Sequence, residues 1–68
     1  MKNTIKVERA KNNITQAQLA DLANVTRQTI NAMELGKYAP STVLALKLAS
    51  IFKVELSELF SLEESDWD

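Results

Sequence analysis

The side chains best suited to chemistry in this sequence lie close together, between residues 27 and 34. Arg27, Gln28 and Asn31 are spaced so that all three fall on the polar side of a helix. Arginine makes paired hydrogen bonds to guanine O6 and N7, and glutamine or asparagine makes them to adenine N6 and N7. The chemistry that this stretch offers is therefore recognition by hydrogen bonding.

The composition gives little support to catalysis. The 68 residues include no His and no Cys, so the usual general base, the thiolate nucleophile and the commonest metal ligands are missing. The carboxylates and lysines form no cluster that resembles a catalytic site. We therefore expect a protein that is not an enzyme and that uses no metal and no cofactor.

The polar face belongs to the second of two short helices that the sequence predicts between residues 15 and 36. Thr15 can cap the first helix, because its side-chain oxygen accepts from a free N–H of the first turn. Leu19 and Ala23 are four apart and form a narrow apolar stripe. Asn24 tolerates the left-handed backbone that a sharp helix ending requires.

The second helix has its own apolar side and its own ending. Ile30 and Met33 are three apart and form its apolar side, and Gly36 ends the helix without a steric penalty. The first helix carries small residues at Ala17 and Ala20, which allow the two axes to approach closely at a steep crossing. That geometry is typical of a helix-turn-helix unit.

The run from Thr15 to Ser41 reads T-Q-x-x-L-A-x-x-x-x-V-T-R-Q-T-I-x-x-x-E-x-G-K-Y-x-P-S. This pattern resembles the lambda-repressor-like (XRE-type) helix-turn-helix transcriptional regulators, and the resemblance covers roughly residues 5–60. It implies an all-α, compact five-helix DNA-binding domain. We expect one domain over residues 1–68, with the helix-turn-helix core at 15–36 and an acidic tail at 61–68.

Three further helices are expected, over about residues 5–13, 42–52 and 56–60. In the first of these, Ile5, Val7 and Ala10 are available for packing. Lys53 stands where the family usually has a glycine that ends the fourth helix, so an altered ending is expected there. For the termini two alternatives stay open: a small antiparallel β-ribbon of Lys2–Thr4 with Ser61–Glu63, or a frayed acidic tail.

The net charge of −1 conceals a strong asymmetry along the chain. Residues 1–53 hold all eight Lys and Arg and three acids, a net charge of +5, and residues 54–68 hold six acids and no base. A basic body suits a surface that faces phosphates, and an acidic end suits a part that stays away from them.

The resemblance, together with these charges, implies double-stranded DNA as the partner and assigns roles to individual side chains. Base contacts are expected from Arg27, Gln28, Asn31 and Thr29. Phosphate contacts are expected from Gln16, Thr26, Lys37 and Tyr38. A structural salt bridge between Arg9 and Glu34 is expected to join the first helix to the end of the third.

We therefore expect a sequence-specific transcriptional regulator, acting as a repressor and as a homodimer on a pseudo-palindromic operator. The dimer contact is expected around the fifth helix, at Leu56 and Leu59. The alternative is an antitoxin or another protein-interaction module with autoregulatory DNA binding. No apolar run approaches the length of a membrane span, so we expect a cytoplasmic protein without a membrane partner.

Overall fold

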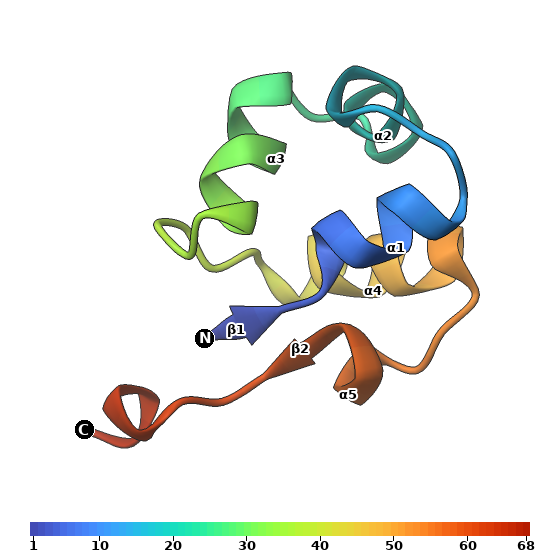
Figure 1. Ribbon diagram of the computed structural model, residues 1–68. Helices are drawn as coiled ribbons and strands as arrows, with labels where there is room; N and C mark the ends of the chain where they lie inside the picture. The colour runs from blue at the N-terminus through green and yellow to red at the C-terminus, as the bar shows by residue number, and fades with distance from the viewer.

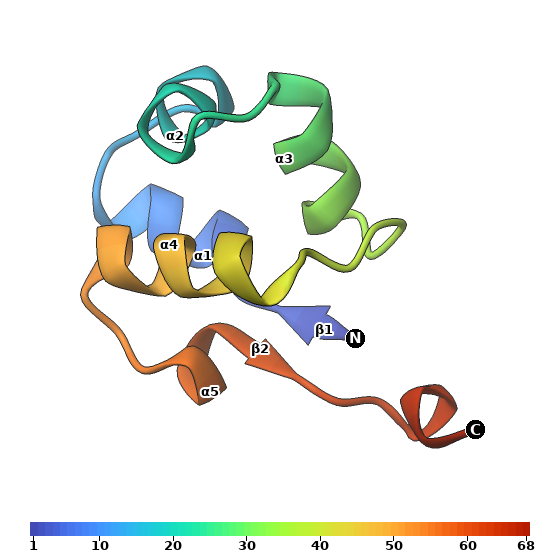
Figure 2. The ribbon, with the colours of Figure 1, turned by 180° about the vertical axis from the view of Figure 1, so that it is seen from behind.

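The computed structural model describes residues 1–68. Its elements are, in chain order, β1 (Lys2–Asn3), α1 (Ile5–Lys11), α2 (Gln16–Ala23), α3 (Arg27–Glu34), α4 (Thr42–Phe52), α5 (Leu56–Leu59), β2 (Phe60–Ser61) and the 3-10 helix η1 (Glu64–Trp67). The expected five-helix domain is confirmed. Helices α2 and α3 lie at one end, α5 and the strands lie at the other, and α1 and α4 lie between them (Figure 1, Figure 2).

Every one of the five helices contributes to a single apolar core. The largest fully buried side chains are Ile5, Leu19, Ile30, Met33, Leu48 and Leu59. Helix α4 runs across the middle and adds the buried side chains of Leu44 and Phe52. Helix α3 is thus attached to the body through Ile30 and Met33, and its opposite side remains in solvent.

Local capping rules explain how α2 and α3 begin and how the turn between them forms. Thr15 Oγ1 accepts from the backbone N–H of Gln18 at 3.0 Å, and Gln18 Oε1 accepts from the backbone N–H of Thr15 at 2.8 Å. Thr26 Oγ1 caps α3 by accepting from the N–H of Thr29 at 3.1 Å. Asn24 ends α2 in the left-handed conformation, with φ of 59°. The expected roles of Thr15 and Asn24 are confirmed, and Thr26 caps the second helix in the same way as Thr15 caps the first.

Helix α1 is shorter than the sequence predicts, and its packing differs. It ends at Lys11, because Asn13 adopts a left-handed conformation with φ of 56°. Ile5 is buried as expected, but Val7 and Ala10 are exposed. A helix of about two turns presents only one narrow side to the core. The expectation that Val7 and Ala10 pack inward was therefore wrong.

Helix α4 starts and ends where the sequence predicts. Ser41 Oγ accepts from the N–H of Leu44 at 3.2 Å and caps the helix. Lys53 takes the left-handed conformation with φ of 57°, and the next N–H, that of Val54, donates to the carbonyl of Ala49 at 3.1 Å. Helix α4 therefore ends in the left-handed conformation that glycine usually adopts at this position, but the residue is Lys53, so the ending carries some backbone strain.

The two termini pair as a short antiparallel ribbon, with Lys2 opposite Ser61 and Asn3 opposite Phe60. The ribbon was one of the two alternatives, but its second strand begins at Phe60, one residue earlier than expected. Phe60 follows the last residue of α5 and has an extended backbone, and its side chain is buried in the core. The rest of the tail forms η1, and none of the helices is long and apolar enough to cross a bilayer.

Candidate nucleic-acid interface

The exposed side of α3 carries the polar residues that the sequence singles out. Arg27, Gln28 and Asn31 are exposed, whereas Ile30 and Met33 on the other side are buried. A hollow of about 250 Å³ is lined by these three polar residues and by Gln16 at the start of α2, and no apolar side chain lines it. The first turns of α2 and α3 therefore share one open polar surface.

Arg9 and Glu34 hold the far end of α3 against α1. Arg9 Nε lies 2.7 Å from Glu34 Oε2, and Arg9 Nη2 lies 3.0 Å from Glu34 Oε1, so the pair is bidentate. The hydrogen bond to Glu34 raises the pKa of Arg9 above its ordinary value, although burial acts in the opposite direction. Arg9 Nη1 also donates to the carbonyl of Ile14 at 3.2 Å, which fixes the loop before α2.

Gln16 connects this ion pair to the polar surface. Its Nε2 donates to Glu34 Oε1 and to Asn31 Oδ1, both at 3.2 Å. Both amide hydrogens of Gln16 thus have acceptors within the chain, and none remains for a phosphate oxygen. The phosphate contact expected for Gln16 stays a prediction, and without DNA its side chain bridges the start of α2 to α3.

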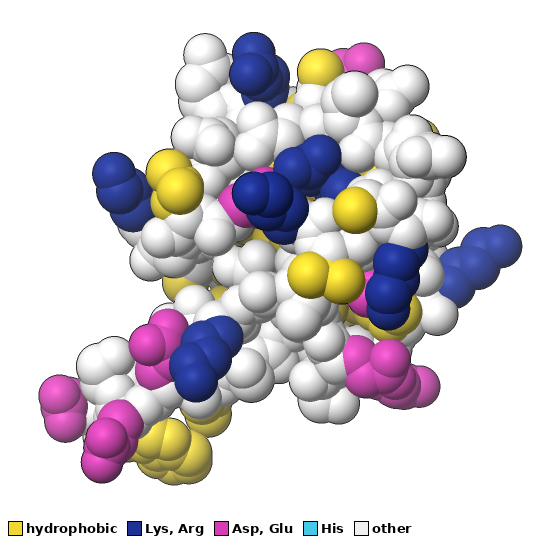
Figure 3. Space-filling view, viewed as in Figure 1, with side chains coloured by type: hydrophobic (Ala, Val, Ile, Leu, Met, Phe, Trp, Pro, Cys, Tyr) yellow, Lys and Arg dark blue, Asp and Glu magenta, His cyan; other side chains and the backbone are white.

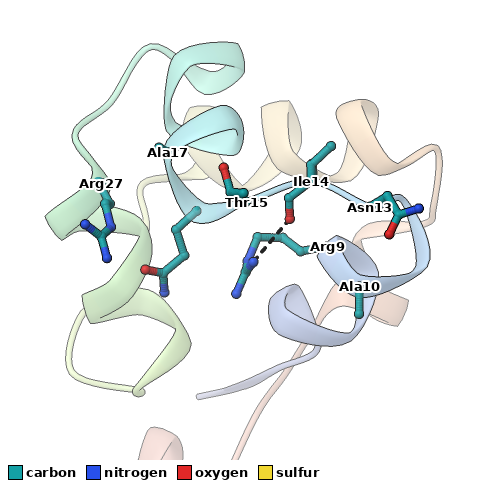
Figure 4. A pocket seen from close by; sticks show the side chains of 8 residues that line it. Arg9, Ala10, Asn13, Ile14, Thr15, Ala17 and Arg27 are labelled. Atoms are coloured by element: carbon teal, nitrogen blue, oxygen red, sulfur yellow. Dashed lines mark hydrogen bonds between the residues drawn. The ribbon is translucent and has the colours of Figure 1, made fainter.

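A larger hollow of about 560 Å³ lies beside this surface, between α1, the following loop and the starts of α2 and α3. Figure 4 shows Arg9 and Arg27 projecting into the space from α1 and α3, with Thr15 and Asn13 along the connecting loop. Asn13 was not among the residues expected at the site. The signal for it is weak, because only its left-handed backbone marks it as a special position.

The remaining residues expected at DNA lie around α3. Lys37 and Tyr38 are exposed in the loop that follows Gly36, whose φ is 75°. The hydroxyl groups of Thr26 and Thr29 are 2.9 Å apart at the start of α3. Thr26 is exposed and Thr29 is partly buried. Thr26 and Thr29 thus lie at the N-terminal end of α3, and Lys37 and Tyr38 follow its C-terminal end.

Asn3 fixes α3 from the opposite direction, a contact that the sequence analysis did not include. Its Nδ2 donates to the carbonyl of Met33 at 2.7 Å. The backbone N–H of Thr4 donates to the carbonyl of Leu59 at 3.0 Å, which attaches this strand to α5. The end of α3 is thus held from both α1 and the terminal ribbon.

Charge is distributed over the surface as the sequence predicts. Figure 3 shows Lys and Arg spread over the helical body, while most Asp and Glu on this face lie along its lower part, on the extension at the lower left and on the body at the lower right. That extension is fastened in part by the amino group of Met1, which lies 3.2 Å from Glu63 Oε1 and 3.1 Å from Asp66 Oδ2. The acidic segment therefore has a fixed place, at the end of the molecule away from α2.

The two residues expected in a dimer contact, Leu56 and Leu59, differ in how far their side chains are exposed. Leu56 on α5 is 37% exposed and is available for an interface, but Leu59 is 1% exposed and belongs to the core. The side chain of Leu59 is already covered within one chain, so Leu56 is the residue of this pair with surface to offer a partner, and the dimer contact itself stays a prediction. A separate apolar hollow of about 530 Å³ lies between α2 and α4, and its lining includes Leu22, Val43 and Leu46.

The fold and this surface define a helix-turn-helix DNA-binding protein, in which one helix presents polar side chains and the helix before it crosses its start. A family model described as helix-turn-helix matches residues 5–59. The chain belongs to the XRE-type helix-turn-helix family of DNA-binding transcriptional regulators, which is not a family of enzymes.

Curated relatives agree with this assignment along the whole chain. An uncharacterized HTH-type transcriptional regulator of Methanocaldococcus jannaschii is 47% identical over 66 residues, which cover 97% of this chain and 100% of the relative. The uncharacterized HTH-type transcriptional regulator YgzD of Bacillus subtilis is 42% identical over 66 residues, with the same two shares. A third, from Archaeoglobus fulgidus, is 42% identical over 69 residues, covering 100% of this chain and 97% of that protein.

Proposed function

We propose that this regulator recognises a specific duplex sequence by placing α3 in the major groove. The observation that carries the proposal is the exposed polar face of α3, with Arg27, Gln28 and Asn31 beside an open hollow that has no apolar lining. In helix-turn-helix proteins the N-terminal residues of the second helix contact base edges. Arg27 and Gln28 are the main readers, and Thr29 borders them.

Phosphates are bound at the two ends of the reading helix. Thr26 lies at its start, and Lys37 and Tyr38 lie just beyond its end, all exposed. Contacts at both ends fix the register of the helix on the duplex without reading the sequence. The acidic tail lies on the C-terminal extension, at the end of the molecule away from α2 (Figure 1).

The regulator acts as a homodimer, because one α3 offers few base contacts and two half-sites about one helical turn apart supply the missing specificity. The exposed apolar side chains of Leu56, Leu62 and Trp67 in the C-terminal part support an interface there. A dimer that covers two half-sites excludes other proteins from that DNA, so repression by occlusion in the cytoplasm is the simplest mode of action.

Sedimentation of the wild type and of two matched variants tests the dimer. Leu56→Glu is expected to give a monomer with an unchanged helical spectrum, while Leu46→Glu, which places the same charge in the α2/α4 hollow, leaves the dimer intact. Dissociation by Leu46→Glu alone would move the interface to α2 and α4. A wild type that remains monomeric, also on DNA, would contradict the homodimer.

Selection from a duplex library of random sequence tests recognition itself. The wild type is expected to enrich one two-fold symmetric site, with an affinity that falls steeply as salt rises. Enrichment of no sequence at either of two salt concentrations would overturn the proposal. It would favour the alternative function, a protein-interaction module that uses its exposed Trp67 and the surrounding acids.

A further inference from the structure

Glu34, Gln16 and Asn31 form a chain of hydrogen bonds. In this chain each residue determines whether the next side-chain amide turns its NH2 or its oxygen toward it. Glu34 accepts two hydrogen bonds from Arg9 and its side chain is only 7% exposed. An ionised carboxylate can only accept. The group that Gln16 turns toward Glu34 is therefore its NH2, at 3.2 Å.

The same NH2 group then determines the orientation of Asn31. Its second hydrogen points to Asn31 Oδ1, also at 3.2 Å. If the Asn31 amide turned over, its own NH2 would face the NH2 of Gln16, and two donors would oppose each other. Asn31 is thus held with its oxygen toward Gln16, and its Nδ2 donates to no group of the chain although the residue lines the polar hollow.

We infer that Gln16 is a positioning residue that sets Asn31 to read guanine rather than adenine. This inference rests on the proposed function, and it reverses the usual pairing of asparagine with adenine. That pairing needs Oδ1 to accept from adenine N6 while Nδ2 donates to N7. Here Oδ1 already accepts from Gln16, which uses one of its two lone pairs and fixes the amide. Both hydrogens of Nδ2, by contrast, lack an acceptor in the chain and suit the adjacent acceptors O6 and N7 of guanine.

The experiment compares sites selected from a random duplex library by the wild type, Asn31→Ala and Gln16→Ala. Asn31→Ala identifies the base pair that Asn31 reads, because the preference is lost at that position alone. There the wild type is expected to favour guanine over adenine by roughly tenfold. Gln16→Ala frees the Asn31 amide to turn, so the guanine preference at this position is expected to fall to within about threefold, with other positions unchanged.

Replacement of that guanine by 7-deazaguanine, which lacks the N7 acceptor, supplies a second readout. Binding of the wild type should weaken by roughly five- to tenfold, and binding of Asn31→Ala should not change. A merely structural role for Gln16 would instead lower affinity at all positions equally. Unfolding curves of each variant establish that it folds.

Several results would overturn the inference. Adenine at the position identified by Asn31→Ala would do so, as would an unaltered guanine preference in Gln16→Ala. If Asn31→Ala changes no position while the wild type still selects a site, the inference fails and the proposed function stands. If the wild type selects no site, both fail.

Discussion

Arg9 Nε lies 2.7 Å from Glu34 Oε2 and so joins α1 to the last turn of α3. The side chain of Glu34 is nearly covered, so loss of Arg9 leaves a carboxylate without its main partner in a site that water hardly reaches. The pair therefore bears both on stability and on the angle at which α3 meets the body.

Arg9→Ala is expected to lower the free energy of unfolding by about 3 kcal/mol, because breaking a largely buried pair leaves one charge poorly compensated. Lys11→Ala is the matched control. It removes the exposed partner of Glu8, whose Oε2 lies 3.4 Å from Lys11 Nζ, and should cost less than about 1 kcal/mol. Denaturant unfolding measures both, and equal losses would contradict the structural role of the pair.

The helix caps give a second prediction. Thr15→Ala removes the acceptor of the Gln18 N–H and is expected to cost about 1 kcal/mol of stability, which corresponds to a fall in Tm of roughly 4–8 °C for a domain of this size. Thr42→Ala is the control, since Thr42 follows the capping Ser41 and does not itself cap α4. Thermal unfolding that shows the same Tm for both variants would be evidence against the capping box.

Replacement by glycine is expected to have opposite effects on stability at Lys53 and at Lys47. Lys53→Gly relieves a side chain from the left-handed region, where φ is 57°, and is expected to stabilise the protein by about 1 kcal/mol. Lys47→Gly, in the interior of α4, is expected to destabilise it by about 1 kcal/mol. A loss of stability in both variants would mean that the helix ending carries no strain.

Asp66 makes η1 sensitive to acid. The backbone N–H of Glu63 donates to Asp66 Oδ2 at 2.7 Å, and this contact, followed by that with the amino terminus, lowers the pKa of Asp66 from its ordinary value of 3.8. A lowered pKa stabilises the folded form above pH 3.8, and this contribution is lost as the pH falls further. Trp67 fluorescence should report the loosening of η1 below that pH.

Asp66→Asn is the control for this titration. The amide can still accept from the Glu63 N–H but does not titrate, so the change in Trp67 fluorescence below pH 3.8 should disappear or become much smaller. The same change in the variant would assign it to the other acids of the tail.

Local rules were sufficient wherever a feature depends on neighbours in sequence. Thr15, Asn24, Thr26 and Gly36 each act within a few residues, and the sequence alone predicted where α2 and α3 begin and end. Helical periodicity also placed Ile30 in the core. It could not separate Leu56 from Leu59, since which side of a single-turn helix is covered depends on the packing of the rest of the fold.

Features that depend on the crossing of two helices were beyond the sequence. Gln16 was expected to contact a phosphate, which stays a prediction, but nothing in the sequence shows that the approach of α2 to α3 brings Glu34 and Asn31 within 3.2 Å of its amide. The ribbon register depended in the same way on whether Phe60 entered the core. In both cases side chains distant in sequence determine the outcome.

The central claim is that α3 reads bases, and it is tested most directly by affinity for a selected site and for a scrambled duplex. Arg27→Ala and Gln28→Ala are expected to lose discrimination worth about 1–3 kcal/mol each. Lys47→Ala, which removes a charge at the α2/α4 hollow, should leave the ratio of the two affinities unchanged. If Arg27→Ala and Gln28→Ala kept the wild-type ratio, α3 would not be the reading helix.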